Sequence, residues 1–324
     1  MKFINFSGYI LLILLLLYIG QRPIYATFGD TVNYYRGYIR YQNGAKIGEV
    51  GDYGWHVFMK FMANIASIHT FFTICAIIYI YPLYRISKQF FGKYWYYSFV
   101  LFIISFSFWT YGVNGVRNGA ALSLFLWGIS YQKNKVAMSI CFLIAIMFHK
   151  TSILPILAYV LTFYINDPKF YLKAWLLCIP LSLAFGSIFV VIFSSLGFGE
   201  ESRLSYLTTQ AEEGTFAYDG FRWDFLFHSA FPVFAGWYFV IKKKFEDQMY
   251  YRLLNTYLIC NGFWILIINA NYSNRFAYLS WFMMAIVIIY PLLKQNMFKY
   301  HHFMIGKIMV IYFSFTYFMY YFYK

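Results

Sequence analysis

The chain has 324 residues, of which 61% are apolar, 25% are aromatic and only 12% are charged. A soluble domain carries about 25% charged residues, so this composition excludes a cytosolic enzyme, a secreted module and a disordered chain, and it indicates a membrane protein. The formal net charge of +14 does not indicate nucleic acid, because the basic residues are spread between apolar runs instead of forming one basic face. Anionic lipid is the expected partner of these cations.

The first apolar run covers about residues 4–20 and follows Lys2. Ile24, Tyr25 and Ala26 come soon after it and resemble a signal-peptide cleavage site, although Ile24 is bulky for such a site. We favour retention of this run as the first membrane span. Cleavage would leave the rest of the topology unchanged.

A membrane-spanning helix needs about 20 predominantly apolar residues, and ten further apolar runs bounded by charge are candidates for such helices. The eleven predicted spans cover approximately residues 4–20, 67–84, 94–112, 114–132, 135–149, 151–166, 173–196, 223–241, 252–269, 275–293 and 305–323. With the amino terminus in the cytoplasm, every inner link carries at least two Lys or Arg, as the positive-inside rule requires. The sequence therefore predicts an all-α polytopic protein in which residues 1–324 form a single transmembrane domain.

Two longer segments are predicted on the outer, periplasmic side, at about residues 21–66 and 197–222, and both mix charge, Tyr and Gly. Five apolar residues in the first segment recur at helical spacing: Trp55, Phe58, Met59, Met62 and Ile65. This spacing predicts a short amphipathic helix that lies on the outer membrane interface.

The cysteines and histidines do not indicate a metal site. The four cysteines lie inside apolar runs and lack the paired short spacing of a zinc site; they are Cys75, Cys141, Cys178 and Cys260. The histidines other than His149 show no ligand-like spacing either. We therefore expect neither a metal nor another cofactor.

Charge is absent from the middles of the predicted spans, which argues against an ion-coupled transporter with a site near the midplane. The charged or titratable residues of the spans lie at their outer ends: Arg117, His149, Lys150, Arg222, Asp224 and Arg275. The first outer segment adds Asp30, Arg36, Arg40, Glu49 and Asp52. If the helices form a bundle, these groups converge on one pocket, where guanidinium groups suit phosphate oxygens because they bind them in pairs.

Each of these residues also has a structural interpretation. An arginine at a helix end commonly reaches to the lipid headgroups, and this explains Arg117, Arg222 or Arg275 equally well when each is taken alone. Their shared side of the membrane is harder to explain in that way. His149 is either a helix-end histidine or a catalytic one. The glycines at 112, 115 and 119 indicate close helix packing rather than a phosphate loop.

Several short stretches resemble the bacterial Wzy-type polysaccharide polymerases, in the branch grouped with EpsG-like proteins. The resemblance covers most of the chain. The stretches are, in order, Asp30, Tyr34 and Tyr35 followed by Glu49 and Gly54; Gly115, Arg117, Asn118 and Ala120; Phe148, His149, Lys150 and Ser152; GFRWDF at 220–225; and Asn274, Arg275 and Phe276. Asn118 stands where the family usually has a glutamine, and it keeps an amide there.

The resemblance implies a GT-C-like membrane glycosyltransferase that makes O-antigen or capsule chains at the outer face of the bacterial plasma membrane. The growing glycan, carried on undecaprenyl diphosphate, is the donor, and a lipid-linked repeat unit is the acceptor. A chain-length regulator protein is a further expected partner. The implied reaction needs no nucleotide sugar.

This chemistry assigns roles to the residues at the outer ends of the spans. Cations stabilise a departing diphosphate, and we assign that role to Arg117, Arg222, Arg275 and Lys150. A base must take the proton of the acceptor hydroxyl; His149 is the first candidate, Asp224 the second, and Asp52 or Glu49 the third. Asp224 alternatively orients Arg222. Further substrate contacts are expected from Asn118, Arg36, Arg40, Asp30 and Trp55.

Four other functions compete with a polymerase. A ligase that moves glycan from the same carrier to another acceptor needs nearly the same cations. A lipid-linked oligosaccharide flippase predicts a polar cavity that reaches the inner leaflet, and the uncharged midplanes argue against it. A membrane acyltransferase predicts a catalytic histidine deep in the bundle. A purely structural role is the remaining alternative.

Overall fold

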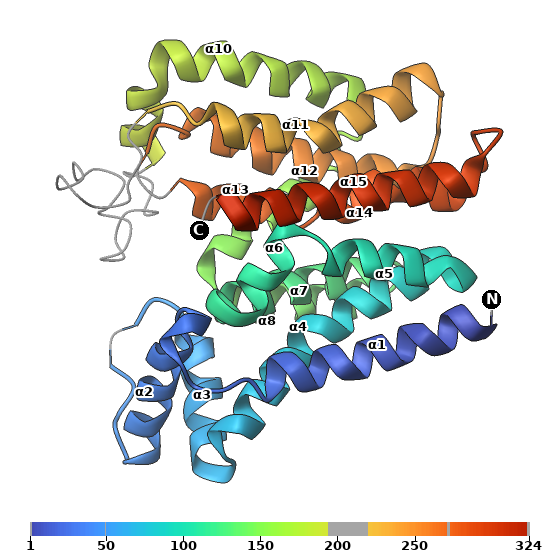
Figure 1. The fold of residues 1–324 in the computed structure, drawn as a ribbon. Helices are drawn as coiled ribbons and strands as arrows, with labels where there is room; N and C mark the ends of the chain where they lie inside the picture. Colours follow the sequence, from blue (N-terminus) through green and yellow to red (C-terminus); the bar gives the residue numbers. More distant parts are fainter. Residues whose placement is uncertain (1, 49, 194–219, 271–272, 323–324) are drawn as a thin grey trace. The chain divides into compact units, whose positions relative to one another are not determined.

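The computed structural model describes residues 2–48, 50–193, 220–270 and 273–322, and this part of the chain is helical without a strand (Figure 1). Two π-helical segments, Thr110–Asn114 and Tyr238–Lys242, follow α6 and α11. The α-helices are α1 (Lys2–Gly20), α2 (Thr31–Gln42), α3 (Tyr53–Ile65), α4 (Ile68–Phe91), α5 (Trp95–Ile103), α6 (Phe106–Trp109), α7 (Val116–Ser130), α8 (Lys135–Phe148), α9 (Ile153–Leu161), α10 (Pro168–Phe193), α11 (Trp223–Trp237), α12 (Gln248–Leu266), α13 (Asn274–Trp281), α14 (Met284–Lys294) and α15 (His301–Phe322).

The described helices overlap all eleven predicted spans. Five stretches are long and apolar enough to cross a membrane by themselves: Ile68–Ile103, Pro168–Phe193, Trp223–Lys242, Asn274–Lys294 and His301–Tyr321. Shorter apolar helices cover Phe6–Gly20, Lys135–Phe148 and Lys150–Leu161. The protein is therefore an all-α, polytopic integral membrane protein. The number of crossings, their orientation and the single transmembrane domain stay predictions.

Two predicted spans are interrupted by serine side chains. The span expected at 94–112 breaks after α5, where the Ser105 hydroxyl donates to the carbonyl oxygen of Phe102 at 2.6 Å. The span expected at 275–293 divides into α13 and α14, and the Ser280 hydroxyl donates to the Ala277 carbonyl oxygen at 2.7 Å. Such bonds compete with the helical amides and bend the helix, an effect that an apolar run does not reveal.

The helices form two compact units, of which the first comprises Met1–Ile153 and Leu292–Lys324. In this unit α4 packs against both α1 and α7, and α8 packs against α7. Glycines make the contact with α4 close: a Cβ added at Gly119 would lie 2.8 Å from the Tyr111 carbonyl oxygen and 3.1 Å from the Tyr79 ring. The close-packing interpretation of this glycine agrees with the structure.

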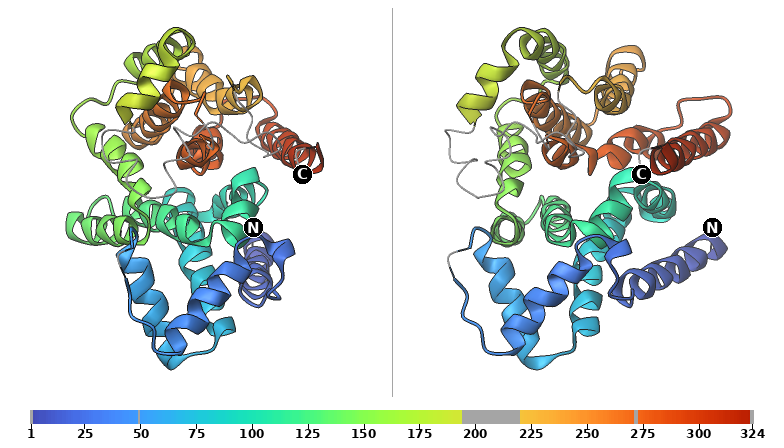
Figure 2. Two further views of the ribbon diagram at one scale, coloured as in Figure 1. Left: turned by 90° about the vertical axis from the view of Figure 1, so that its left-hand side faces the viewer. Right: turned by 60° about the vertical axis from the view of Figure 1, so that its left-hand side comes forward.

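The first outer segment contains two helices, α2 and α3, that pack side by side (Figures 1 and 2). The predicted helix is present as α3, with Trp55, Met59 and Met62 buried, whereas Ile65 is exposed. Helix α2 was not predicted, because its apolar surface comes from tyrosines in a polar sequence. Glu49 and residues 197–219, most of the second outer segment, lie outside the described residues.

The second unit, Leu154–Pro291, has a polar centre. The Asn261 side chain accepts a hydrogen bond from Trp175 Nε1 at 2.8 Å and donates to Ser229 Oγ and Ser280 Oγ, both at 3.0 Å. Ser229 Oγ also accepts from Trp281 Nε1 at 2.7 Å. These bonds join α10, α11, α12 and α13, and bonds of this kind between membrane helices average about 0.6 kcal/mol each. They fix the helices that carry Arg222 and Arg275 at their amino ends.

Candidate active site

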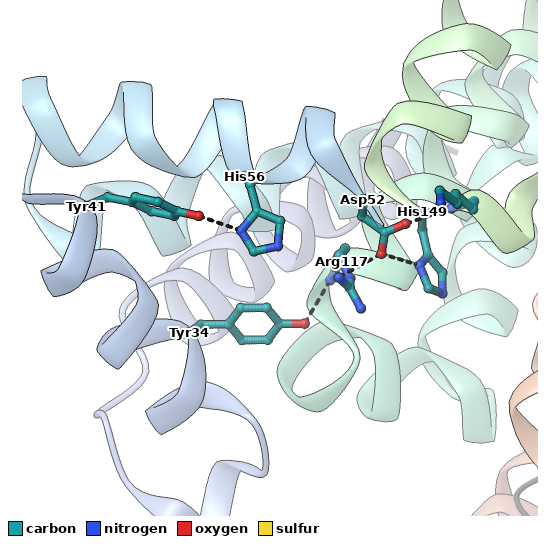
Figure 3. A network of polar contacts seen from close by, with 7 residues as sticks. Tyr34, Tyr41, Asp52, His56, Arg117 and His149 are labelled. Atoms are coloured by element: carbon teal, nitrogen blue, oxygen red, sulfur yellow. Dashed lines mark hydrogen bonds and ion pairs between the residues drawn. The ribbon is translucent and has the colours of Figure 1, made fainter. Parts of the chain in front are cut away.

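Asp52 is the centre of a polar cluster in the first unit. It occupies the position before the first turn of α3, where a carboxylate usually caps the helix, but its side chain makes no capping bond. The side chain is instead fully buried and faces α7 and the end of α8 (Figure 3). A carboxylate buried in this way requires partners of opposite charge.

Three donors satisfy Asp52. Its Oδ2 accepts from Arg117 Nη1 at 2.7 Å and from His149 Nδ1 at 2.9 Å, and its Oδ1 accepts from the backbone amide of Lys150 at 3.0 Å. Burial alone would raise the pKa of Asp52, but the hydrogen bond and charge of His149, the charge of Arg117 and the Lys150 amide together lower this pKa to about 2. Asp52 is therefore ionised at neutral pH.

The ionised state of Asp52 sets the tautomer of His149. A carboxylate without a proton only accepts hydrogen bonds, so Nδ1 of His149 must carry the proton that it donates. In the neutral ring, Nε2 then holds a lone pair, and Figure 3 shows that this nitrogen points away from Asp52. The His149 side chain is 16% exposed, and its role as a base stays a prediction.

Arg117 lies in the first turn of α7, which begins after the π-helical segment Thr110–Asn114 and Gly115. The amino end of a helix carries partial positive charge and favours anions, so an arginine there is electrostatically unfavourable without compensation. Asp52 supplies that compensation through one nitrogen of the guanidinium. The side chain remains 18% exposed, and the binding of an anion by this arginine stays a prediction.

The amide of Asn118 points toward the core rather than to Asp52. Its Nδ2 donates to the Tyr111 hydroxyl at 3.1 Å. Its Oδ1 is buried and has no hydrogen-bond donor among the described residues. Asn118 therefore offers an acceptor one residue after Arg117.

The close contact of α3 with α8 depends on Gly54. A Cβ added at this glycine would lie 2.6 Å from Met147 Cβ and 2.9 Å from the Met147 carbonyl oxygen. Such distances oblige the backbone to move, and the movement would separate Asp52 from His149. Positioning of this kind matters, since displacement of a catalytic group by about 1 Å can cost about 10²-fold in rate.

We therefore expect Gly54→Ala to lower the activity of the protein by roughly 10- to 100-fold while the helix content, measured by circular dichroism, is retained. Gly48→Ala is the matched control, because a Cβ at Gly48 meets no atom within 4 Å. A Gly54→Ala protein as active as the control would show that the contact with α8 does not position the site.

The remaining predicted residues of the first outer segment have different surroundings. Asp30 is exposed, and its backbone amide donates to Asn114 Oδ1 at 2.9 Å. Arg36 and Arg40 are exposed on α2. Trp55 is 1% exposed and packs against the rings of Tyr34, Phe58, Phe71 and Phe148. Substrate binding by these residues stays a prediction, as it does for the exposed Lys150.

The other predicted cations belong to the second unit. Arg222 forms a two-pronged ion pair with Asp224, in which Nε reaches Oδ1 at 2.9 Å and Nη2 reaches Oδ2 at 2.6 Å. Its guanidinium also lies 3.7 Å from the centre of the Phe225 ring. The proposal that Asp224 orients Arg222 agrees with this geometry. Arg275 is exposed in the first turn of α13. Convergence of these residues with Arg117 stays a prediction.

Sequence reasoning missed the central place of Asp52 and a buried arginine, Arg22. Asp52 ranked only third among the candidate bases, although an Asp directly before an amphipathic helix was visible in the sequence. Arg22 is 3% exposed; its Nε donates to Thr31 Oγ1 at 3.0 Å and its Nη1 to the Ile19 carbonyl oxygen at 2.7 Å. Its position just after the first apolar run resembles that of an ordinary interface cation.

Acid should weaken the fold through Asp52. The pKa of this carboxyl is about 2 in the folded protein, below its ordinary value of 3.8, so folding favours the ionised form. The stabilisation is present above about pH 4 and is lost as the pH falls toward 2. We expect the thermal unfolding temperature of the detergent-solubilised protein to fall between pH 4 and pH 3, and this fall to be smaller in Asp52→Asn.

The structure defines a polytopic helical membrane protein in which a buried carboxylate holds an arginine and a histidine at the ends of its helices. The chain belongs to the EpsG family, whose model matches residues 5–324. This family is linked to exopolysaccharide synthesis. Comparison with curated proteins and with solved structures gave no match. The predicted relationship to EpsG-like proteins is confirmed, and the identity as a Wzy-type polymerase stays a prediction.

Proposed function

We propose that this protein is a membrane glycosyltransferase that polymerises oligosaccharide repeat units carried on undecaprenyl diphosphate. The reaction takes place at the outer face of the bacterial plasma membrane. The growing glycan moves from its carrier to the non-reducing end of a new lipid-linked unit. The products are O-antigen, capsule or exopolysaccharide chains, and a chain-length regulator protein is a further expected partner.

The observation that carries this proposal is the bond between Asp52 and His149. A glycosyl acceptor is a neutral hydroxyl that needs a base within hydrogen-bond reach. Asp52 holds the His149 ring in the tautomer whose Nε2 accepts a proton, and it stabilises the charge that the ring then gains. Among the predicted bases that the structure describes, His149 is the one that has a buried carboxylate to orient it and to compensate the charge it gains.

The leaving group explains why an arginine lies beside this histidine. Departure of a diphosphate develops negative charge, and preorganised donors that meet this charge are worth about 10² to 10³ in rate each. Arg117 and the amino end of α7 provide such donors next to His149. We assign Lys150 to the same anion as a further cation, while diphosphate binding by Arg222 and Arg275 of the second unit stays a prediction.

The proposed reaction needs no reactant besides the donor and the acceptor. The acceptor oxygen forms a bond to the anomeric carbon of the donor glycan, and its proton passes to Nε2 of His149. The bond between that carbon and the diphosphate oxygen breaks, and its electron pair leaves with the diphosphate. Undecaprenyl diphosphate is released when the proton returns from His149 to solvent.

The test uses the purified full-length protein in liposomes with a lipid-linked repeat unit as the sole substrate. Products are separated by length on a gel, and a ladder of increasing length is expected. Products confined to one added block would instead indicate a ligase. Movement of the lipid-linked unit between leaflets without any new glycosidic bond would indicate a flippase and would refute the proposal.

A further inference from the structure

Helix α2 carries a row of tyrosines on one face. Tyr34, Tyr38 and Tyr41 recur with steps of four and three residues, which places them one above another on a helix. The hydroxyl of Tyr38 donates to the carbonyl oxygens of Met62 and Ala66 at 2.9 and 2.8 Å. This bond has an evident structural role, because it ties α2 to the last turn of α3.

Tyr41, the last of the row, is also committed to a contact within the outer segment. Its hydroxyl lies 2.9 Å from Nδ1 of His56 on α3 (Figure 3). Tyr38 and Tyr41 therefore hold α2 and α3 together.

Tyr34 differs from Tyr38, because its hydroxyl is a hydrogen-bond acceptor. Its hydroxyl oxygen accepts a hydrogen bond from the backbone amide of Arg117 at 3.3 Å (Figure 3). A phenol has one proton of its own to donate, and among the described residues the Tyr34 hydroxyl is found only as an acceptor. The ring packs edge-on against Trp55, with centroids 5.7 Å apart, so the hydroxyl is held at the start of α7.

Tyr34 keeps this proton at neutral pH. Burial raises the pKa of the phenol and Asp30 raises it further, and these effects outweigh the charge and amide of Arg117, which lower it. The residue as a whole is only partly buried. Tyr34 is thus a neutral donor beside a cation.

A second group with an unused donor hydrogen lies near the Tyr34 phenol. The Arg22 guanidinium donates to Thr31 Oγ1, one helical turn before Tyr34 on α2, at 3.0 Å, and its Nη2 is buried without an acceptor. It stacks on Phe72, 4.2 Å from the ring centre, and it forms no ion pair in the part of the chain that the structure describes. A buried charge normally has a paired anion, so these two donors together indicate an anionic acceptor from outside the chain.

We propose that Tyr34 is a substrate-binding residue, whose hydroxyl donates a hydrogen bond to a diphosphate oxygen of the lipid carrier that Arg117 binds. This inference rests on the proposed function and adds a contact to the same site. A phosphate oxygen fits better than a sugar hydroxyl, because the surroundings are two guanidinium groups and the amino end of a helix.

The decisive comparison is Tyr34→Phe against Tyr38→Phe, since each removes one hydroxyl from the same face of α2. Hydrogen bonds to charged groups are worth enough to predict a roughly 10- to 100-fold weaker affinity of Tyr34→Phe for saccharide-free undecaprenyl diphosphate. This affinity is measured by thermal-shift titration of the full-length protein in detergent, with undecaprenol as a ligand that lacks the diphosphate. The ligand-free Tyr34→Phe protein should lose little thermal stability, because it gives up one long hydrogen bond, from the Arg117 amide at 3.3 Å.

Tyr38→Phe should behave in the opposite way. Loss of its bonds to α3 is expected to lower the unfolding temperature by roughly 1 to 4 °C and to leave the affinity for undecaprenyl diphosphate unchanged. Wild-type affinity in Tyr34→Phe, together with weakened binding in Arg117→Ala, would overturn the Tyr34 assignment alone. Wild-type affinity in both variants would overturn the proposed diphosphate site as well.

Discussion

Arg117→Ala is expected to abolish the formation of long glycan chains. The substitution removes the cation that meets the departing diphosphate, and loss of one such donor costs about 10²- to 10³-fold in rate. It also removes the Arg117 Nη1 group that lies 2.7 Å from Oδ2 of the buried Asp52 carboxylate. The rate of repeat-unit addition by the protein in liposomes measures the effect directly, and the protein level in the membrane shows whether the variant is still inserted.

Two further variants make this prediction specific. Arg117→Lys keeps the charge but loses the planar fork, which holds Asp52 with one nitrogen while others face an anion; we expect partial activity, between wild type and Arg117→Ala. Lys46→Ala removes an exposed cation of the first outer segment and serves as the control with wild-type activity. Normal chain lengths in Arg117→Ala would remove the arginine from the reaction.

Asp52→Asn is expected to have an effect of similar size for a different reason. The carboxylate accepts from Arg117, His149 and the Lys150 amide through two oxygens, whereas an asparagine has one acceptor oxygen and adds two donor hydrogens. The His149 ring loses the partner that fixes its tautomer. Loss of effective base catalysis lowers the rate by about 10²- to 10⁴-fold.

A double variant separates this explanation from a general loss of structure. If Asp52 acts through His149, then Asp52→Asn combined with His149→Gln should be no slower than the more damaging single variant, because groups that act as a unit are not additive. Rate losses that multiply would show that the two residues act independently. The pH dependence of the residual rate in each variant identifies the group that still titrates.

The sequence predicts the helices of this protein well where apolar length decides the outcome. All eleven expected spans overlap helices, since burial in lipid demands long apolar runs. It does not predict the breaks at Ser105 and Ser280, which depend on hydroxyl bonds within one turn. It also misses α2, whose signal was a spacing of tyrosines instead of aliphatic residues.

The sequence predicts which residues belong to the candidate site better than it predicts how they contact one another. Arg117 and His149 were recognisable as polar residues at helix ends on one side of the membrane. The sequence could not show that Asp52 joins them, because the bonds run between residues 65 and 97 positions apart. The donor state of Tyr34 likewise depends on which atom of α7 it meets.

In the proposed reaction Arg117 is shared between Asp52 and the substrate, and this sharing affects turnover. Spent undecaprenyl diphosphate stays anionic, so an unopposed arginine would retain it after the glycan has moved. Asp52 already occupies Nη1 of this arginine and stays ionised at neutral pH, which limits the net attraction that the carrier experiences. In the proposed reaction, the same carboxylate that prepares the base therefore helps the product to dissociate, so that the next repeat unit can enter.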